Sequence, residues 1–381
     1  MCAAAFLLSA CGGGSGSGSS TLLGSGQDPD PVVVDFPIAY VKRPLLLDDN
    51  GDLMRIDVRE PADFMPGAEL LLRDRASPSA EERSLTAGIF PDDADGNPPL
   101  YDVRDLEVSY DGTQLVFALR APEDPNLDPD EQPTWNIWLY DHTLGTVTRV
   151  IQSDIVAEDG DDIAPSFLPD GRIVFSSTRQ RRSKAILLDE GKPQFSALDE
   201  DRNQEAFTLH VVNADGSDLH QISFNQSSDL DPSVLGDGRI VFSRWDNVAN
   251  LDRISLYTMH PDGTALQLLY GVHSHDTGPN GEIVEFMKPR ELPDGRLLVQ
   301  LRPRAAQTRM GAIPVAIDTA AFVEHDQPTA ANQGLLGDAQ EVPIPGDINL
   351  DDATPAGAAT PPCAPCSTVA TGCWWPGVSA G

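Results

Sequence analysis

The chain has 381 residues, of which 40% are hydrophobic, and is long enough for one large domain or two smaller ones. Its 26 basic and 59 acidic residues give a formal net charge of −33. Such a surface repels phosphate groups, which excludes nucleic acid as a partner. No stretch reaches the roughly 18 apolar residues that a membrane-spanning helix needs. The 32 glycines and 32 prolines indicate a fold with many turns and few long helices.

The N-terminus has the pattern of a bacterial lipoprotein signal. A short apolar run ends in Leu-Ser-Ala-Cys, which is typical of the lipobox whose cysteine becomes lipidated. We therefore expect a signal over residues 1–11 that ends at Cys11, followed by a flexible Gly/Ser-rich linker over residues 12–30. No lysine or arginine precedes Lys42, so the positive start of a signal peptide is missing. A misassigned start codon would explain this, and the alternative is a cytosolic chain with a chance apolar start.

Four Asp-Gly pairs mark an internal repeat. They begin at Asp111, Asp170, Asp237 and Asp294, in steps of 59, 67 and 57 residues, and a β-branched or apolar run follows each. The two central copies are near twins, APSFLPDGRIVFS and DPSVLGDGRIVFS. Self-similarity at such a period is typical of repeat architectures.

Each repeat reads as four strands. Asp-Gly favours a tight turn between two strands, and the Ile-Val-Phe run that follows suits a buried strand. A second hairpin follows in each unit, as in LHVVNADGSDLHQIS. The sequence therefore predicts an all-β fold over residues 31–350, a TolB-like β-propeller of four-stranded blades with about four to five blade units. Too few units remain to close a ring comfortably, so we expect a propeller that is incomplete at its C-terminus.

A charged insertion, residues 180–206, interrupts one blade. We expect it to form a surface loop on one face, where propellers place binding functions.

The last segment, residues 351–381, changes abruptly to an irregular composition with three of the five cysteines and two adjacent tryptophans. A frameshift would explain it, because the shifted frame can encode another Asp-Gly turn and an apolar strand. The alternative is a genuine tail. Cys363 and Cys366 form a C-x-x-C, but Ser367 stands where haem attachment needs histidine.

The polar stretch GVHSHDTG contains the candidate metal ligands His273, His275 and Asp276. In an extended segment the two histidines project to one side, and imidazole with carboxylate suits zinc or iron. The alternative is a polar loop between blades whose histidines bond to the backbone. Phosphate-binding, zinc-protease and serine-hydrolase signatures are lacking in the sequence, so no catalytic or cofactor-binding residue is assigned.

The blade pattern is similar to the TolB-type propeller repeats of bacterial envelope proteins. The strings FPIAYVKRP, DGRIVFSSTR, LHVVNADGSDLHQIS, DPSVLGDGRIVFSRWD and HSHDTG make residues 36–350 resemble the N-terminal part of hydrazine synthase alpha-subunit-like proteins. The resemblance implies a propeller and a location outside the cytoplasm. Longer members carry c-type haem, but this sequence contains no C-x-x-C-H, so haem chemistry is not implied here.

Two functions follow as expectations. The first is a non-catalytic lipoprotein of the bacterial periplasm or outer membrane, anchored through Cys11, whose propeller binds a protein or a small-molecule ligand. The second is a fragment of a multidomain redox protein related to the hydrazine synthase alpha subunit. A metal-dependent enzyme built around His273, His275 and Asp276 is a third and weaker hypothesis.

Overall fold

The computed structural model describes residues 36–44, 60–77, 79–93, 95–198, 205–248, 251–303 and 312–343. The signal at 1–11, the linker at 12–30 and the tail at 351–381 lie outside the described residues. The prediction that the propeller is incomplete at its C-terminus also concerns residues outside the described ranges.

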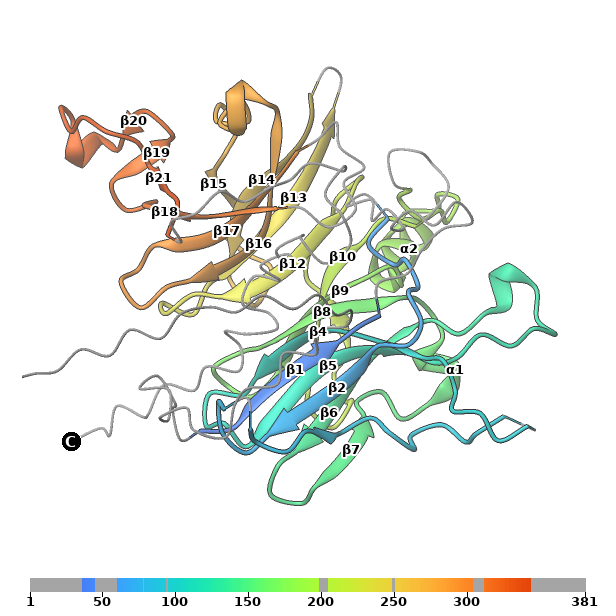
Figure 1. The fold of residues 1–381 in the computed structure, drawn as a ribbon. Helices are drawn as coiled ribbons and strands as arrows, with labels where there is room; N and C mark the ends of the chain where they lie inside the picture. The colour runs from blue at the N-terminus through green and yellow to red at the C-terminus, as the bar shows by residue number, and fades with distance from the viewer. Residues whose placement is uncertain are drawn as a thin grey trace, which may run out of the picture.

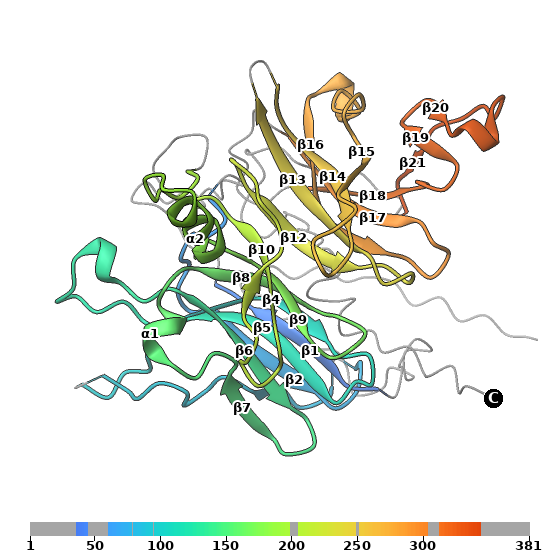
Figure 2. The ribbon, with the colours of Figure 1, turned by 180° about the vertical axis from the view of Figure 1, so that it is seen from behind.

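The described residues form five antiparallel sheets, numbered here as blades 1 to 5, and a separate small hairpin (Figures 1 and 2). Blade 1 contains β1 (Ile38–Lys42), β2 (Glu69–Arg73) and β3 (Arg83–Ser84). Blade 2 contains β4 (Asp102–Val108), β5 (Gln114–Arg120), β6 (Trp135–Asp141) and β7 (Thr146–Arg149). Blade 3 contains β8 (Asp162–Phe167), β9 (Ile173–Ser177), β10 (Thr208–Val212) and β11 (His220–Gln221).

Blade 4 contains β12 (Asp229–Val234), β13 (Ile240–Val248), β14 (Leu251–Met259) and β15 (Gln267–Tyr270). Blade 5 contains β16 (Val284–Glu291), β17 (Leu297–Pro303), β18 (Ile313–Ile317) and β21 (Gln340–Glu341), and β19 (Phe322–Glu324) pairs with β20 (Gln327–Pro328). The helices are short: α1 (Asp154–Ala157), α2 (Arg181–Asp189) and the 3-10 turns Pro129–Glu131, Pro279–Gly281 and Ala330–Asn332. The predicted all-β propeller of four-stranded blades is confirmed, with three strands described in blade 1.

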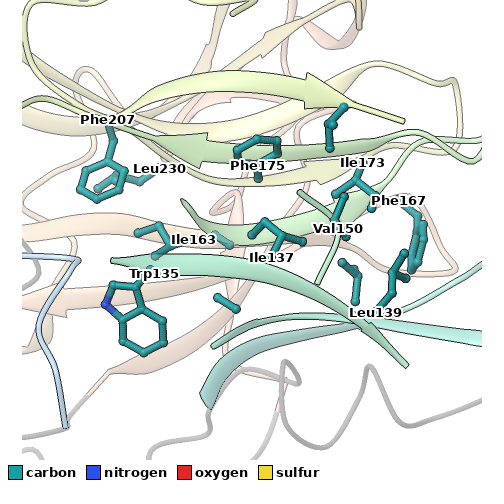
Figure 3. Close-up of a cluster of buried hydrophobic side chains, with 14 of the residues drawn as sticks. Trp135, Ile137, Leu139, Val150, Ile163, Phe167, Ile173, Phe175, Phe207 and Leu230 are labelled. Carbon is teal, nitrogen blue, oxygen red and sulfur yellow. The ribbon is translucent and has the colours of Figure 1, made fainter. Parts of the chain in front are cut away.

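The apolar strands of the central blades are buried on both faces. Ile173 and Phe175 of β9 pack towards blade 2, against Ile137 and Leu139 among others (Figure 3). Val174, between them, points to the other side and packs in a cluster with Ile240 and Phe242 of blade 4. Successive strand residues point to opposite faces, so the unbroken Ile-Val-Phe run contributes to two inter-blade cores at once.

A repeated hydrogen bond joins each blade to the next. A side chain nine residues before each Asp-Gly accepts a backbone N–H of the preceding blade. In blade 1 this N–H precedes β2, and in blades 2 to 4 it lies in or just before the third strand. The donor–acceptor pairs, with their distances, are Met65 to Asp102 (2.8 Å), Trp135 to Asp161 (3.0 Å), Phe207 to Ser228 (3.3 Å) and Ile254 to Glu285 (2.7 Å). Each bond satisfies a backbone N–H of one blade with a side chain of the next.

The insertion at 180–206 includes helix α2, which the sequence did not predict. Gln180, which is buried, anchors its base by donating to the carbonyls of Ala197 and Ala206 and by accepting the N–H of Ala197. No residue of α2 is buried, although Ile186 and Leu188 are apolar. The helix therefore rests on the surface of blade 3 near β11 and adds little to the core.

His210 of β10 is a buried histidine whose charge state depends on folding. Its Nδ1 lies 3.0 Å from the Thr208 carbonyl and its ring lies 5.9 Å from that of Phe175. Burial lowers the pKa of His210 to about 3. The unfolded chain, by contrast, takes up this proton near pH 6.5, so the contribution of His210 to stability is complete above that pH and is lost as the pH falls towards 3.

We expect the variant His210→Asn to lose this pH dependence. At pH 5 the wild-type protein should have lost about 2 kcal/mol of unfolding free energy through His210, and the variant none of it. Urea unfolding curves between pH 7 and pH 4 measure the difference. Asp162, whose pKa burial raises to about 6 against the charge of Arg179, has the opposite pH dependence, and this should cancel in the comparison. His142→Asn, at an exposed site, is the control, and equal pH slopes for wild type and His210→Asn would contradict the assignment.

Candidate functional site

The innermost strands of blades 2 to 5, which are β4, β8, β12 and β16, share an unusual backbone feature. Each contains a β-bulge, and the bulged residue has a positive φ although it is not glycine. These residues are Asp105 (φ 52°), Ala164 (51°), Asp231 (51°) and Lys288 (51°), each six residues before an Asp-Gly pair. A left-handed conformation costs an ordinary residue about 1–2 kcal/mol. Bulges re-aim side chains and are frequent beside functional sites, so four equivalent ones point to the propeller axis as the candidate site.

Charged side chains from three blades meet where these strands converge. The Nζ of Lys288 in blade 5 lies 2.9 Å from Oδ1 of Asp105 in blade 2 and 3.2 Å from Oδ1 of Asp231 in blade 4. The other oxygen of Asp105 accepts from Nε of Arg104 at 2.8 Å and from the backbone N–H of Ala164 at 3.2 Å. One lysine thereby links the second, fourth and fifth blades.

A second group lies two residues further along the same strands. Arg290 of blade 5 pairs with Glu107 of blade 2 through Nη2 and Oε2 at 2.9 Å. The Ser166 hydroxyl of blade 3 donates to Oε1 of Glu107 at 3.2 Å. We call Arg104, Asp105, Glu107, Ser166, Asp231, Lys288 and Arg290 the axial cluster.

The charges of the axial cluster balance. Its three carboxylates face three cationic side chains, and all six are a quarter exposed or less. Burial acts to raise the pKa of Asp105, but the neighbouring charges of Arg104 and Lys288 outweigh it and hold that pKa well below its usual value. Burial raises the pKa of Glu107, against the opposing effects of Arg290 and Ser166. The cluster therefore offers both anionic and cationic groups for hydrogen bonding.

Partial exposure gives these groups a capacity to bind. Because the cluster is already balanced, a group that pairs with Lys288 or Arg290 displaces a carboxylate from it. A ligand that carries both signs of charge can exchange these ion pairs without leaving a charge unmatched. Ion pairs and hydrogen bonds across a binding interface give specificity, because they require a partner of matching geometry and charge.

The three predicted metal ligands differ in burial. His275 is buried, with Nδ1 at 2.6 Å from the Val284 carbonyl and Nε2 at 3.2 Å from the Ser255 hydroxyl. His273 and Asp276 are exposed. Within the described ranges, no group of three His, Cys, Asp or Glu side chains is placed to hold a metal ion.

The contacts of His275 fit the alternative reading of this stretch, in which a histidine of an inter-blade loop bonds to the backbone. Its ring also packs edge-on against Phe286 at 5.2 Å. Metal binding by His273, His275 and Asp276 stays a prediction. The predicted lipidation site, Cys11, lies outside the described residues.

The axial cluster was missed by sequence reasoning, although a signal for it exists. Counting back six residues from each Asp-Gly pair gives Asp105, Ala164, Asp231 and Lys288, and counting back four gives Glu107, Ser166, Ser233 and Arg290. Aligning the repeats on their turns would have shown charges of both signs at equivalent positions. Among the described helices, none is long and apolar enough to cross a membrane.

A scan against protein-family models finds no match, and neither does a search of curated proteins. Solved structures do match. Hydrazine synthase from Kuenenia stuttgartiensis aligns with a TM-score of 0.52 at 15% identity, over 76% of this chain and 38% of that one. TolB from Acinetobacter baumannii aligns with a TM-score of 0.44 at 12% identity, over 78% of this chain and 54% of that one.

This chain thus spans less than two thirds of the length of either protein. At such low identity the likeness to hydrazine synthase concerns the fold alone. The sheet order of the described residues and this likeness together identify the chain as a β-propeller distantly similar in structure to hydrazine synthase.

Proposed function

We propose that this protein is a non-catalytic binding module of the bacterial cell envelope. In this proposal the propeller recognises a protein or small-molecule ligand through the axial cluster, and a lipid on Cys11 holds it at the membrane. The observation that carries the proposal is the convergence of six charged side chains of the innermost strands, five of which occupy two sets of equivalent repeat positions. Three of these strands contribute a charged residue at a bulge with left-handed backbone, a geometry that is costly to maintain.

A second candidate is a part of a multidomain redox protein related to the hydrazine synthase alpha subunit. The alignment with hydrazine synthase, which covers 38% of that chain, favours it. In that case the propeller would support domains that lie beyond the sequence given.

The lipid anchor is tested by paired cysteine variants. In a Gram-negative host fed with labelled palmitate, we expect the wild-type chain to incorporate the label and to sediment with membranes. Cys11→Ser should lose both properties, because only the lipobox cysteine is a substrate for lipidation. Cys2→Ser is the matched control and should retain both. Equal labelling of all three proteins would contradict the assignment of Cys11.

The binding role of the axial cluster is tested by replacing both partners of one ion pair. The double variant Glu107→Gln with Arg290→Met removes two opposite charges at similar volume, so the stability should change by no more than about 1–2 kcal/mol. We expect its capture of envelope components, measured by quantitative mass spectrometry of affinity-purified protein, to fall at least about tenfold.

The control for this experiment is Asp170→Asn with Arg172→Met, which removes an ion pair from an exposed turn of blade 3. A folded axial variant that captures the same components in wild-type amounts would overturn the proposal that the axial cluster binds them.

The second candidate is tested by sequencing the genomic DNA from codon 340 to several hundred bases past the stop. A single-base change that restores Asp-Gly repeats and leads to a C-x-x-C-H would establish a longer, haem-attached protein. An intact reading frame with no such coding region downstream would exclude it.

A further inference from the structure

A cavity of about 340 Å³ lies beside blade 4, built from residues other than those of the axial cluster. Its walls are the segment between β11 and β12 and the far part of β13. The lining residues are Phe224, Asn225, Gln226, Ser227, Arg244, Asp246 and Asn247. Phe224, Gln226 and Asn247 are exposed, so the cavity opens to solvent.

The walls of this cavity present both polar and apolar atoms. Six of the seven lining residues have polar side chains, which include amide, hydroxyl, carboxylate and guanidinium groups. Their carbon atoms and the Phe224 ring nevertheless supply the larger part of the lining surface, as in most small-molecule sites. Such walls suit a ligand that has both apolar faces and hydrogen-bonding groups.

The guanidinium of Arg244 is held loosely. Its Nη1 lies 3.5 Å from Asp229 and its Nε lies 3.6 Å from Asp246, and its Nη2 donates to the Phe224 carbonyl at 3.3 Å. The buried Nη1 makes no hydrogen bond. Because arginine has five N–H donors, the Arg244 guanidinium has fewer hydrogen-bond partners than donors, and this residue lines the cavity.

Arg179 of blade 3 pairs with Asp162, the repeat equivalent of Asp229, and is saturated by comparison. Nε of Arg179 lies 3.0 Å from the Ser177 hydroxyl and 3.1 Å from Asp162, and its Nη1 donates to the Val156 carbonyl at 2.8 Å. Hydrogen-bond partners therefore enclose the guanidinium of Arg179 in blade 3, whereas Arg244 in blade 4 lines a cavity.

The charge of the cavity disfavours anionic ligands. Arg244 faces two carboxylates, Asp229 and Asp246, so no unpaired positive charge is left to hold an anion. Asp246 also accepts the Tyr257 hydroxyl at 2.6 Å. The net charge of −33 repels anions from the whole surface. A neutral ligand fits this balance.

One aromatic ring completes the wall. Phe224 is 46% exposed, and the guanidinium of Arg182 lies 5.8 Å from the centre of its ring. An exposed ring beside planar amide, carboxylate and guanidinium groups suits a sugar ring, whose C–H face can pack on the aromatic ring while its hydroxyls bond to the planar groups in pairs.

We propose that this cavity binds a neutral saccharide. Arg244 and Asp246 hydrogen-bond neighbouring hydroxyls, Asn247 and Gln226 contact the same ligand from the rim, and Phe224 packs against a sugar ring. The inference does not rest on the axial cluster or on the lipid anchor, and it holds or fails independently of them.

The test is titration calorimetry of the full chain with maltose, cellobiose and N,N′-diacetylchitobiose at millimolar concentrations. We expect at least one of the three to bind, with a Kd near or below about 1 mM. Phe224→Ala and Asn247→Ala should each raise that Kd at least about tenfold, which corresponds to about 1.4 kcal/mol. Two variants are used so that a folding defect in one leaves the test intact.

Phe195→Ala is the matched control, because Phe195 is 62% exposed on the insertion of blade 3 and does not line the cavity. It should bind like the wild type, and so should the double variant Glu107→Gln with Arg290→Met. Three outcomes would overturn the inference: no binding of any of the three disaccharides, unchanged binding in both cavity variants, or binding of digalacturonate or leucine in their place with the same dependence on Phe224.

Discussion

Neighbouring blades are held in place by a hydrogen bond between backbone and side chain. A backbone N–H of one blade is satisfied by a side chain of the next, namely Asp102, Asp161, Ser228 or Glu285. Apolar packing alone would tolerate small slides between sheets, because it is not directional. A directional bond at every junction fixes the position of each innermost strand along the axis. The meeting of Lys288 with carboxylates from two other blades depends on that alignment.

The innermost strands meet two demands at once. Their ends take part in the junctions between blades, and their middles aim charged groups at the axis through a bulge with left-handed backbone. Backbone strain of this kind persists only where the surroundings over-determine the conformation. Here the surroundings are the apolar cores on both faces of each central blade, such as those around Phe175 and Phe242. The apolar cores between the blades thereby support the charged groups of the axial cluster.

Local features of the sequence predicted most of the fold. Asp-Gly turns and Ile-Val-Phe runs are decided within a few residues, and the blades they predicted are present. The axial cluster needed long-range information, since Asp105 and Lys288 are 183 residues apart and meet only through the curvature of the whole domain. Helix α2 escaped prediction because it is a single surface element of nine residues without a buried face. The cavity escaped prediction because the near-identical repeats place their arginines differently. An arginine follows Ile173 by six residues and Ile240 by four, and the second of these, Arg244, lines the cavity.

Lys288 also changes how the blades share their stability. In a linear array of repeats each unit contacts only its neighbours, so one end can open while the rest stays folded. The contacts of Lys288 with Asp105, and of Arg290 with Glu107, connect blade 5 directly to blade 2 and bypass the blades between them. Opening the last blade therefore exposes charges that belong to the second. We therefore expect blades 2 to 5 to unfold as one cooperative unit, with the ion pairs at the axis acting as a non-covalent cross-link between blade 5 and blade 2.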